Sequence, residues 1–160
     1  ATALWAGHNS TGDVEADIKA LNSDAAVKKL RTQNKADLVS ALVPGKASGV
    51  VGVGSVPGGN GNANACWSVT RIEAVGAPSR TFAHEIGHNH SAEHDKGHYF
   101  TDSKGNKFRT LLAYQKSAGE KRIPYYSSPK KSYNGNVTGT TSADNASKVS
   151  KLAPKIANYK

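Results

Sequence analysis

Four histidines and two glutamates fall within eleven consecutive residues of this 160-residue chain, where residues 84–94 read His-Glu-Ile-Gly-His-Asn-His-Ser-Ala-Glu-His. His84 and His88 are four residues apart, so on a helix their rings lie on a single face, about 5.4 Å apart along the axis. Two imidazole nitrogens can then meet at one metal ion. No other stretch constrains the fold as strongly, because it requires a helix through residues 84–88 and a chain that turns back soon afterwards.

A third metal ligand must come from beyond this pair. A catalytic zinc ion takes three protein ligands and keeps a fourth position for water. His94 is the better candidate, since a chain that leaves the helix soon after His88 can fold back to the metal within six residues. His90 is the alternative, but two residues after His88 on a helix it points away from the metal-binding face. We therefore expect Zn²⁺ to be bound by His84, His88 and His94.

Glu85 directly follows the first of these histidines. Zinc lowers the pKa of a water bound to it toward 7, and a neighbouring carboxylate can take the proton of that water and later deliver it to a leaving amine. Zinc also polarises a carbonyl group and stabilises the oxyanion that forms when the carbonyl is attacked. The combination predicts hydrolysis of peptide bonds, with Glu85 as the general base.

The residues before the histidine motif carry helical and then strand patterns. Apolar residues at near-helical spacing over residues 13–33 are interrupted at 22–24, which predicts two short helices, with Ser23 or Asp24 capping the second. Strands or short apolar runs are predicted at residues 37–43, 49–53 and 65–72. Cys66 is the only cysteine, so no internal disulfide forms, and it is expected to be a small core residue.

Around and after the motif the patterns are weaker. Pro78 is expected at the first position of the helix that carries the histidines, as proline often is. A loop rich in glycine, lysine and aspartate is expected at 95–107, and a final helix from about 142 to 159. His8 and His98 are expected to be exposed polar residues. Neither internal repeats nor a linker are visible, and the length suits one domain.

The chain has 21 Lys and Arg against 12 Asp and Glu, a formal net charge of +9. Such a surface attracts acidic partners over long distances. Nucleic acid is one such partner, but the lysines are scattered with few aromatic residues among them, which favours a solvated basic surface. No apolar run approaches the roughly 20 residues of a membrane-spanning helix, so we predict no membrane partner. The chain begins with Ala1 rather than Met, which predicts a removed signal or pro-segment and a secreted protein.

The motif and the residues after it resemble the metzincin superfamily of metallopeptidases, whose signature is HExxHxxGxxH. Within that superfamily they resemble the bacterial type of the reprolysin-like, ADAM-related branch, which has Asp next, here Asp95. Residues 109–114 resemble the turn that passes beneath the zinc, and residues 122–129 resemble the wall of the specificity pocket. Residues 144–145 and 153–159 resemble the C-terminal helix of bacterial members.

The resemblance implies an α/β (α+β) fold in a single catalytic domain over residues 1–160. The upper part, about residues 1–91, would hold a twisted mixed sheet, a backing helix and the zinc helix. The smaller lower part, about residues 92–160, would hold the turn and the C-terminal helix, with the substrate cleft between the two parts. A polypeptide substrate would pair as a strand with the edge of the upper sheet, and the basic surface would favour acidic substrates.

Three positions depart from the family pattern. Ser91 replaces the glycine of the bend, so either a non-glycine residue adopts a positive φ or the turn differs in shape. Leu112 replaces an invariant methionine, at a cost usually below about 1.5 kcal/mol. The N-terminal residues match a point inside the family domain, so an opening strand and helix are expected to be absent or supplied by another segment. Tyr114 is placed by the resemblance either at the zinc or oxyanion, or as a packed aromatic beneath the site.

A zinc-dependent endopeptidase is thus the leading prediction, and two alternatives from other classes remain. One is a binding or toxin-like module of the same fold that holds zinc without turnover. Glu85 argues against it, because a structural zinc site has no use for a base. The other is a basic nucleic-acid binder in which the histidines are incidental.

Overall fold

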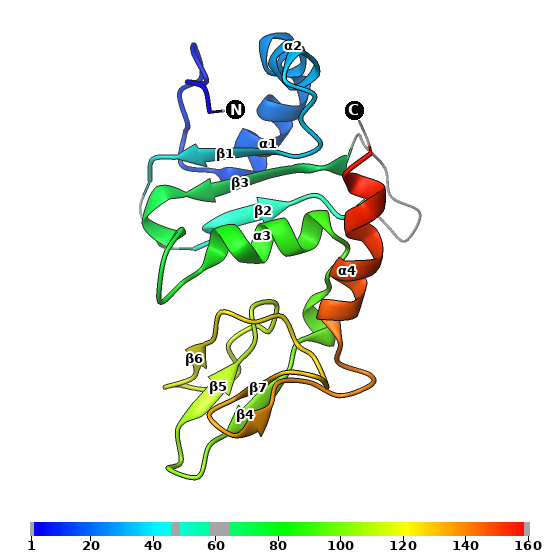
Figure 1. Cartoon of the computed structure of the whole chain (residues 1–160). Coiled ribbons are helices and arrows are strands. Elements are labelled where there is room, and N and C mark those ends of the chain that lie inside the picture. The colour runs from blue at the N-terminus through cyan, green and yellow to red at the C-terminus, as the bar shows by residue number, and fades with distance from the viewer. Residues whose placement is uncertain (1, 46–48, 58–64, 159–160) are drawn as a thin grey trace.

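The computed structural model describes residues 2–45, 49–57 and 65–158 (Figure 1). The helices are α1 (Val14–Ser23), α2 (Ala25–Gln33), α3 (Thr81–Asn89) and α4 (Asn145–Ile156), with short 3-10 turns η2 (Ile72–Ala74) and η3 (His94–Lys96). The strands are β1 (Val39–Val43), β2 (Gly52–Gly54), β3 (Trp67–Arg71), β4 (Tyr99–Thr101), β5 (Lys107–Arg109), β6 (Lys121–Arg122), β7 (Ser132–Tyr133) and β8 (Asn136–Val137). This mixture of helices and small sheets agrees with the predicted α+β class.

A mixed sheet in the order β1-β3-β2 forms the upper part of the molecule in Figure 1. The central strand β3 runs parallel to β1, with Val69 opposite Ala41, and antiparallel to β2, with Val69 opposite Val53. All five residues of β3 are buried, because α1 and α3 both pack against it. Asn89, at the end of α3, donates hydrogen bonds to the carbonyl oxygens of Ser55 and Trp67, both at 2.9 Å. The helix that carries the histidines is therefore tied to the sheet.

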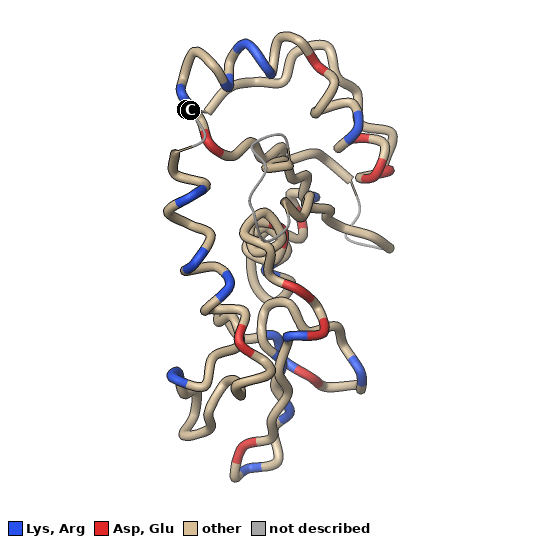
Figure 2. Tube along the Cα trace, turned by 90° about the vertical axis from the view of Figure 1, so that its right-hand side faces the viewer, with Lys and Arg blue, Asp and Glu red and all other residues tan. Residues whose placement is uncertain are grey.

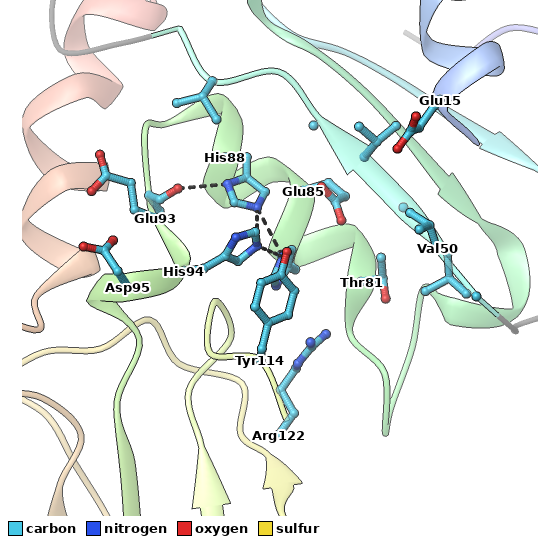
Figure 3. Close-up of a pocket in the computed structure, with 18 residues that line it drawn as sticks. Glu15, Val50, Thr81, Glu85, His88, Glu93, His94, Asp95, Tyr114 and Arg122 are labelled. Carbon is cyan, nitrogen blue, oxygen red and sulfur yellow. Dashed lines mark hydrogen bonds between the residues drawn. The ribbon is translucent and has the colours of Figure 1, made fainter. Parts of the chain in front are cut away.

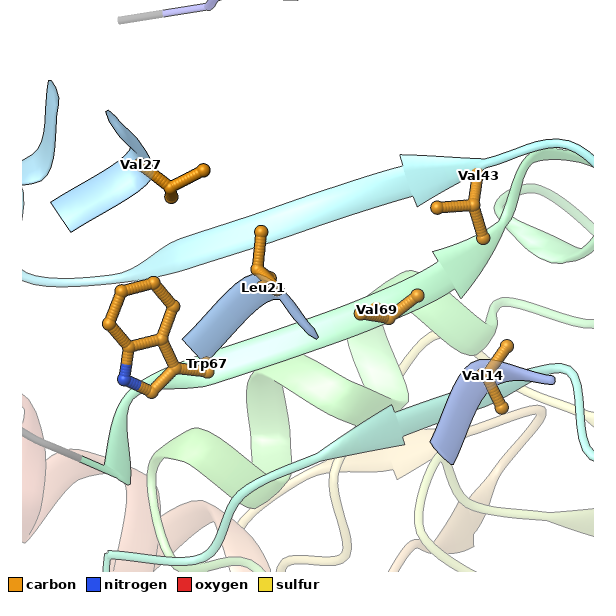
Figure 4. Close-up of a cluster of buried hydrophobic side chains, with 6 residues drawn as sticks. All are labelled: Val14, Leu21, Val27, Val43, Trp67 and Val69. Carbon is orange, nitrogen blue, oxygen red and sulfur yellow. The ribbon is translucent and has the colours of Figure 1, made fainter. Parts of the chain in front are cut away.

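The main apolar core lies between this sheet and the two N-terminal helices (Figure 4). Val14 and Leu21 are seven residues apart on α1, which places both on the face that meets the sheet. The core comprises Val14, Leu21, Val27, Val43, Trp67 and Val69. The two short helices that the sequence predicts are confirmed, and together they cover one face of the sheet.

Asp24 makes the break between α1 and α2. Its Oδ1 accepts hydrogen bonds from the backbone N–H groups of Ala26 and Val27, at 2.8 and 3.1 Å, which caps the start of α2. Its Oδ2 accepts a hydrogen bond from Nε1 of Trp5 at 2.8 Å. Of the two residues that the sequence offered as the cap, Asp24 is the one used.

Small sheets form the lower part of the molecule, and α4 leads back from it (Figure 1). β4, β5 and β6 make one sheet, and β7 and β8 pair as a hairpin. Near its C-terminal end α4 buries Leu152 and Ile156 against Cys66, which is fully buried as predicted. The last helix therefore packs on the upper part as well as beginning in the lower part.

Pro78 does not open α3, so that prediction was wrong. Pro78 lies in a turn, its peptide bond with Ala77 is cis, and the helix begins three residues later at Thr81. The N-cap is Arg80, with φ of 56°. A proline two residues before an N-cap has the same sequence signal as a proline at the first helical position, which explains the error.

The predicted loop over residues 95–107 was also wrong in part, because it contains β4 and the first residue of β5. Phe100 and Phe108 face each other across this strand pair, with ring centroids 5.3 Å apart. Strands of three residues are too short to show a clear alternation. His8 and His98, expected to be exposed, are each partly buried.

Residues 2–38 contain α1 and α2 and no strand. In the described part of the chain, no helix is long and apolar enough to cross a bilayer.

Lysines and arginines are distributed over the upper helices, α4 and the lower part (Figure 2). This spread matches the scattered basic residues of the sequence.

A buried polar cluster joins the N-terminal segment to the sheet. Asp17 of α1 is 1% exposed and pairs with Nε2 of His8 at 2.9 Å and with the hydroxyl of Ser10 at 2.7 Å. Arg71 of β3, also 1% exposed, lies 3.9 Å from the Asp17 carboxylate and donates to the Ser10 hydroxyl at 3.0 Å. His8 stacks on Trp5, with ring centroids 3.7 Å apart. The carboxylate of Asp17 thus compensates a buried guanidinium.

We expect Asp17→Ala to lower the free energy of unfolding by about 3–5 kcal/mol, because it leaves Arg71 as a buried charge without a counter-ion. Glu15→Ala, which removes an exposed carboxylate from the same helix, is the matched control and should change this value by less than about 1 kcal/mol. Urea unfolding of both variants measures the difference. Equal effects would show that Asp17 does not stabilise the buried arginine.

Candidate metal centre and cleft

α3 holds His84 and His88 one turn apart, and Figure 3 shows the ring of His88 directed toward that of His94. Nδ1 of His84 lies 2.7 Å from the carbonyl oxygen of Leu111, and Nδ1 of His88 lies 2.9 Å from that of Ala92. A carbonyl oxygen only accepts, so each Nδ1 carries the proton and donates it. The Nε2 atoms of both neutral rings therefore have free lone pairs, which is the tautomer that binds a metal.

Ser91 terminates the helix in a left-handed conformation, with φ of 58°. Its N–H donates to the carbonyl of His88 at 2.8 Å, and the N–H of Ala92 donates to that of Gly87 at 2.9 Å. This pair of hydrogen bonds is the Schellman motif, which normally has glycine at the left-handed position. Serine there costs roughly 1–2 kcal/mol, but the turn still sends the chain back toward the helix.

His94 returns to the two helical histidines from η3. Its Nε2 lies 3.0 Å from Nε2 of His84 and 2.9 Å from Nε2 of His88. The Nε2 atoms of His84 and His88 are 3.2 Å apart. Ligands at about 2.0–2.1 Å from a tetrahedral metal lie about 3.3 Å from one another, which is close to this spacing. The structure therefore brings together the three histidines that the sequence proposed as ligands, in an arrangement that fits one metal ion.

Hydrogen bonding does not explain this cluster as well as a metal does. Neither His84 nor His88 has a proton left at Nε2, so those two atoms make no hydrogen bond with each other, and only Nε2 of His94 could donate within the cluster. Burial lowers the pKa of His84 to about 3 and that of His94 to about 4, and it also lowers the pKa of His88. All three rings are thus neutral near pH 7, as metal ligands must be.

His90, the alternative third ligand, lies outside the cluster. Its Nδ1 is 2.9 Å from the carbonyl oxygen of Ile86, so this ring packs back along α3.

Asn145 is a residue that the sequence did not indicate as part of the site. It begins α4, and its side chain accepts from the N–H of Glu93 and donates to the carbonyl of the same residue, both at 2.9 Å. Its own N–H donates to the hydroxyl of Ser127 at 3.0 Å, and that hydroxyl donates to the carbonyl of Lys96. Asn145 therefore fixes the backbone directly before His94. The 52-residue separation leaves no local signal from which this contact could be predicted.

The turn at residues 109–114, which the resemblance places beneath the zinc, packs against α3. Leu112 is fully buried, and a Cβ at Gly87 would come within 3.0 Å of its Cδ2 and 2.7 Å of Cε1 of Tyr126. Tyr126 donates its hydroxyl hydrogen to the carbonyl of Ala83 at 2.7 Å. Glycine on the helix thus permits close contact, and Leu112 fills the position under the histidines.

Glu85 lies beside the histidines on α3 and is 4% exposed. A Cβ at Gly54 would lie only 2.6 Å from its carbonyl oxygen, so β2 passes directly over the helix here. Burial raises the pKa of Glu85 to about 8, while the charge of Arg122 acts in the opposite direction.

A cavity of about 840 Å³ opens in front of these groups. β2 and the residues before it form one wall, α3 supplies His84, His88 and Glu85, and η3 supplies His94 (Figure 3). Tyr114 and Arg122 line it from the lower part. Tyr114 is 60% exposed, with its ring 4.0 Å from that of His94, so it borders the open cavity and is not packed beneath the site.

Two histidines on a helix and a third that returns from η3, with a carboxylate beside them and an open cavity in front, have the chemical features of a hydrolytic metal centre. Comparison with known families agrees. The model of Reprolysin_5, described as Metallo-peptidase family M12, matches residues 2–140, and the chain belongs to this family.

Curated relatives carry one name, peptidyl-Asp metalloendopeptidase. The protein from Stenotrophomonas maltophilia (strain R551-3) is 42% identical over 79 residues, which cover 41% of this chain and 19% of that protein. The protein from Xanthomonas campestris pv. campestris is 43% identical over 77 residues, covering 41% of this chain and 18% of the relative. The Pseudomonas aeruginosa protein is 30% identical over 144 residues, which cover 72% of this chain and 24% of that protein. The chain therefore spans only about a fifth to a quarter of the length of these relatives.

A solved structure described as a chaperone-substrate complex has a similar fold. Its TM-score is 0.68 with 22% sequence identity, covering 94% of this chain and 25% of that one. The similarity concerns the fold alone.

We expect His94→Ala to weaken Zn²⁺ binding by more than about 100-fold, because a lost ligand should cost more than the 10- to 100-fold typical of a lost outer partner. His90→Ala removes a neighbouring histidine that lies outside the cluster and should leave the affinity within about threefold. Titration with a zinc-sensitive dye measures both. Equal loss in the two variants would contradict the assignment of His94.

We expect Asn145→Ala to weaken Zn²⁺ binding by roughly 10- to 100-fold, because Glu93 and hence His94 lose their fixed backbone position. Ser147→Ala, on the same turn of α4, removes a hydroxyl that bonds only Asp144 and serves as the control. An affinity in Asn145→Ala equal to that of the control would mean that η3 holds His94 without this contact.

Proposed function

We propose that this chain is the catalytic domain of a zinc-dependent endopeptidase. The observation that carries the proposal is the convergence of three Nε2 atoms beside Glu85 at an open cavity. Membership of the M12 family supports the same reaction class. The relatives are named metalloendopeptidases, but the chain covers only a part of each.

Zinc is the metal that the donor set favours. Three neutral imidazoles with no carboxylate or thiolate among them leave a fourth position open, as in catalytic zinc sites. Imidazole also binds copper, iron and nickel, so the histidines by themselves restrict the metal to this group. When bound, zinc supplies Lewis-acid chemistry, because it acidifies water and polarises the carbonyl of the peptide to be cut.

Glu85 is the general base in this proposal. Glu85 is ionised when a cation is bound at the neighbouring histidines, because that charge lowers its pKa. Its carboxylate then accepts a proton from the attacking water, whose oxygen forms a bond with the carbonyl carbon of the substrate. The bond between that carbon and the amide nitrogen then breaks, and Glu85 delivers the proton to the leaving nitrogen. Tyr114, at the border of the cavity, is in a position to donate its hydroxyl hydrogen to the developing oxyanion. Tyr114→Phe, which lacks only that hydroxyl, tests this role in the assay described below.

An extended polypeptide fits the cavity as substrate. β2 pairs with β3 along one edge only, and β2 lines the cavity. An edge strand can take up an added strand through its free backbone groups. Gly52 and Gly54 let this edge lie close to Glu85. A structure with a bound peptide that avoids β2 would contradict this mode of binding.

Cleavage next to aspartate is proposed on two grounds. The curated relatives are named for peptidyl-Asp bonds. The net charge of +9 also attracts acidic polypeptides at long range. Secretion and removal of a pro-segment stay predictions.

The alternative of a zinc-binding module without turnover has less support. A base beside the histidines, at a cavity large enough for a peptide, has no role in a purely structural site. The nucleic-acid alternative finds no support in the distribution of basic residues, which are spread over several elements (Figure 2).

We expect Glu85→Ala to lower kcat for a denatured protein substrate by about 10²- to 10⁴-fold, because the proton acceptor is lost. Bound zinc should remain stoichiometric, since Glu85 is not a ligand. Wild type treated with a chelator should lose activity and regain it with added Zn²⁺. Activity that survives both treatments would rule out a zinc peptidase. Stoichiometric zinc without hydrolysis by wild type would favour the module without turnover.

A further inference from the structure

Among the described residues that line the cavity, Arg122 is the only lysine or arginine. It lies at the end of β6, and its Nη1 donates to the carbonyl of Ser79 at 2.6 Å. Its own carbonyl accepts from Nε of Arg80 at 3.4 Å. Both ends of the residue are therefore held by the turn before α3. Figure 3 shows the side chain reaching up into the cavity beside Tyr114 and below Thr81.

One donor of the Arg122 guanidinium has no partner in the described part of the chain. Its Nε is buried and makes no hydrogen bond, and no carboxylate in the described part of the chain lies within 4.0 Å of it. Burial lowers the pKa of Arg122 to about 10, and the charge of Arg109 acts in the same direction, while Glu85 and Tyr114 oppose it. This partly buried cation has no direct ion pair, although the charge of Glu85 acts on it from more than 4.0 Å away, and a carboxylate entering the cavity would supply one.

The other charges of the cavity restrict where an acidic side chain can bind. Glu93 and Asp95 lie together near His94, on the far side of the site from Arg122 (Figure 3). Glu93 pairs with Lys148 at 2.6 Å and Asp95 with Lys96 at 3.4 Å. These carboxylates would repel an acidic side chain at that end. Arg122 is the positive charge at the end of the cavity that holds Thr81, where the side chain of Glu85 also lies.

We propose that Arg122 binds the side-chain carboxylate of the substrate aspartate next to the bond that is cut, and so determines the cleavage specificity. This inference rests on the proposed peptidase function. Arginine suits the role because its planar guanidinium donates to both oxygens of a carboxylate and remains charged at every working pH. The anchoring bond from Nη1 to Ser79 holds the group in place before substrate arrives.

A different role for Arg122 would be to orient Glu85, whose pKa it influences. The two roles differ in their dependence on substrate. Loss of a specificity contact slows cleavage only where the substrate has an acidic side chain. Loss of an orienting group slows cleavage of every substrate alike.

The test compares two peptides that differ only in Asp or Asn beside the cleaved bond, since these side chains have nearly the same shape. Wild type should show a higher kcat/KM for the Asp peptide. Arg122→Gln should lower kcat/KM for the Asp peptide by about 10- to 100-fold, the effect of a lost charge-assisted hydrogen bond, and change that for the Asn peptide by less than about threefold. Lys121→Gln removes one positive charge from the exposed neighbouring position on β6 and should leave the Asp to Asn ratio unchanged.

Two further measurements keep the outcome clear. Arg122→Lys retains the charge without the planar group and should show an intermediate Asp to Asn ratio, which covers the case in which Arg122→Gln does not fold. Zinc content should equal that of wild type in every variant. Equal cleavage of the two peptides by wild type, or equal loss on both in Arg122→Gln, would overturn the role of Arg122 and leave the peptidase function standing. No hydrolysis of any substrate by zinc-loaded wild type would overturn both.

Discussion

The hydrogen bonds that two backbone carbonyls accept from the histidine rings are the constraint on which the site depends. The carbonyl oxygens of Leu111 and Ala92 accept hydrogen bonds from the Nδ1–H groups of His84 and His88, which leaves the lone pairs of both Nε2 atoms facing His94. Neither carbonyl belongs to α3. The turn at residues 109–114 and the bend after the helix must therefore both be in place before the histidines have the right tautomer and orientation.

The same dependence explains why the lower part of the molecule matters for a site centred on an upper helix. α3 supplies His84, His88 and Glu85, whereas the cavity is completed by Tyr114 and Arg122 from the chain that follows. Asn145, still further along the chain, holds the segment before His94. A metal ion bound by ligands from separate elements stabilises only the folded arrangement, so binding and folding are coupled here.

Local patterns in the sequence predicted the parts of this arrangement that are themselves local. The four-residue spacing of two histidines indicated the helix, and the break at residues 22–24 indicated two short helices. The start of α3 was misplaced because Pro78 occupies a turn that has the same signal as a helix start. Asn145 was missed because its partner, Glu93, is 52 residues away and no periodicity connects distant loops. Ser91 is intermediate, since the sequence left open whether this residue adopts a positive φ or the turn differs in shape, and the structure shows a φ of 58° with the hydrogen bonds that hold it.

Net charge and local charge carry different information about recognition. The net charge of +9 produces an attraction for acidic molecules that is screened beyond about 8–10 Å at physiological salt. This attraction does not distinguish one part of the protein surface from another. Inside the cavity the balance is the reverse, because four carboxylate residues, Glu15, Glu85, Glu93 and Asp95, line it against one arginine. Selectivity for an acidic side chain at one end of such a cavity must therefore come from the one arginine that lines it, Arg122. Under the proposed function, the basic surface would bring an acidic polypeptide to the cleft, and the position of Arg122 relative to the histidines would decide which bond of that polypeptide is cut.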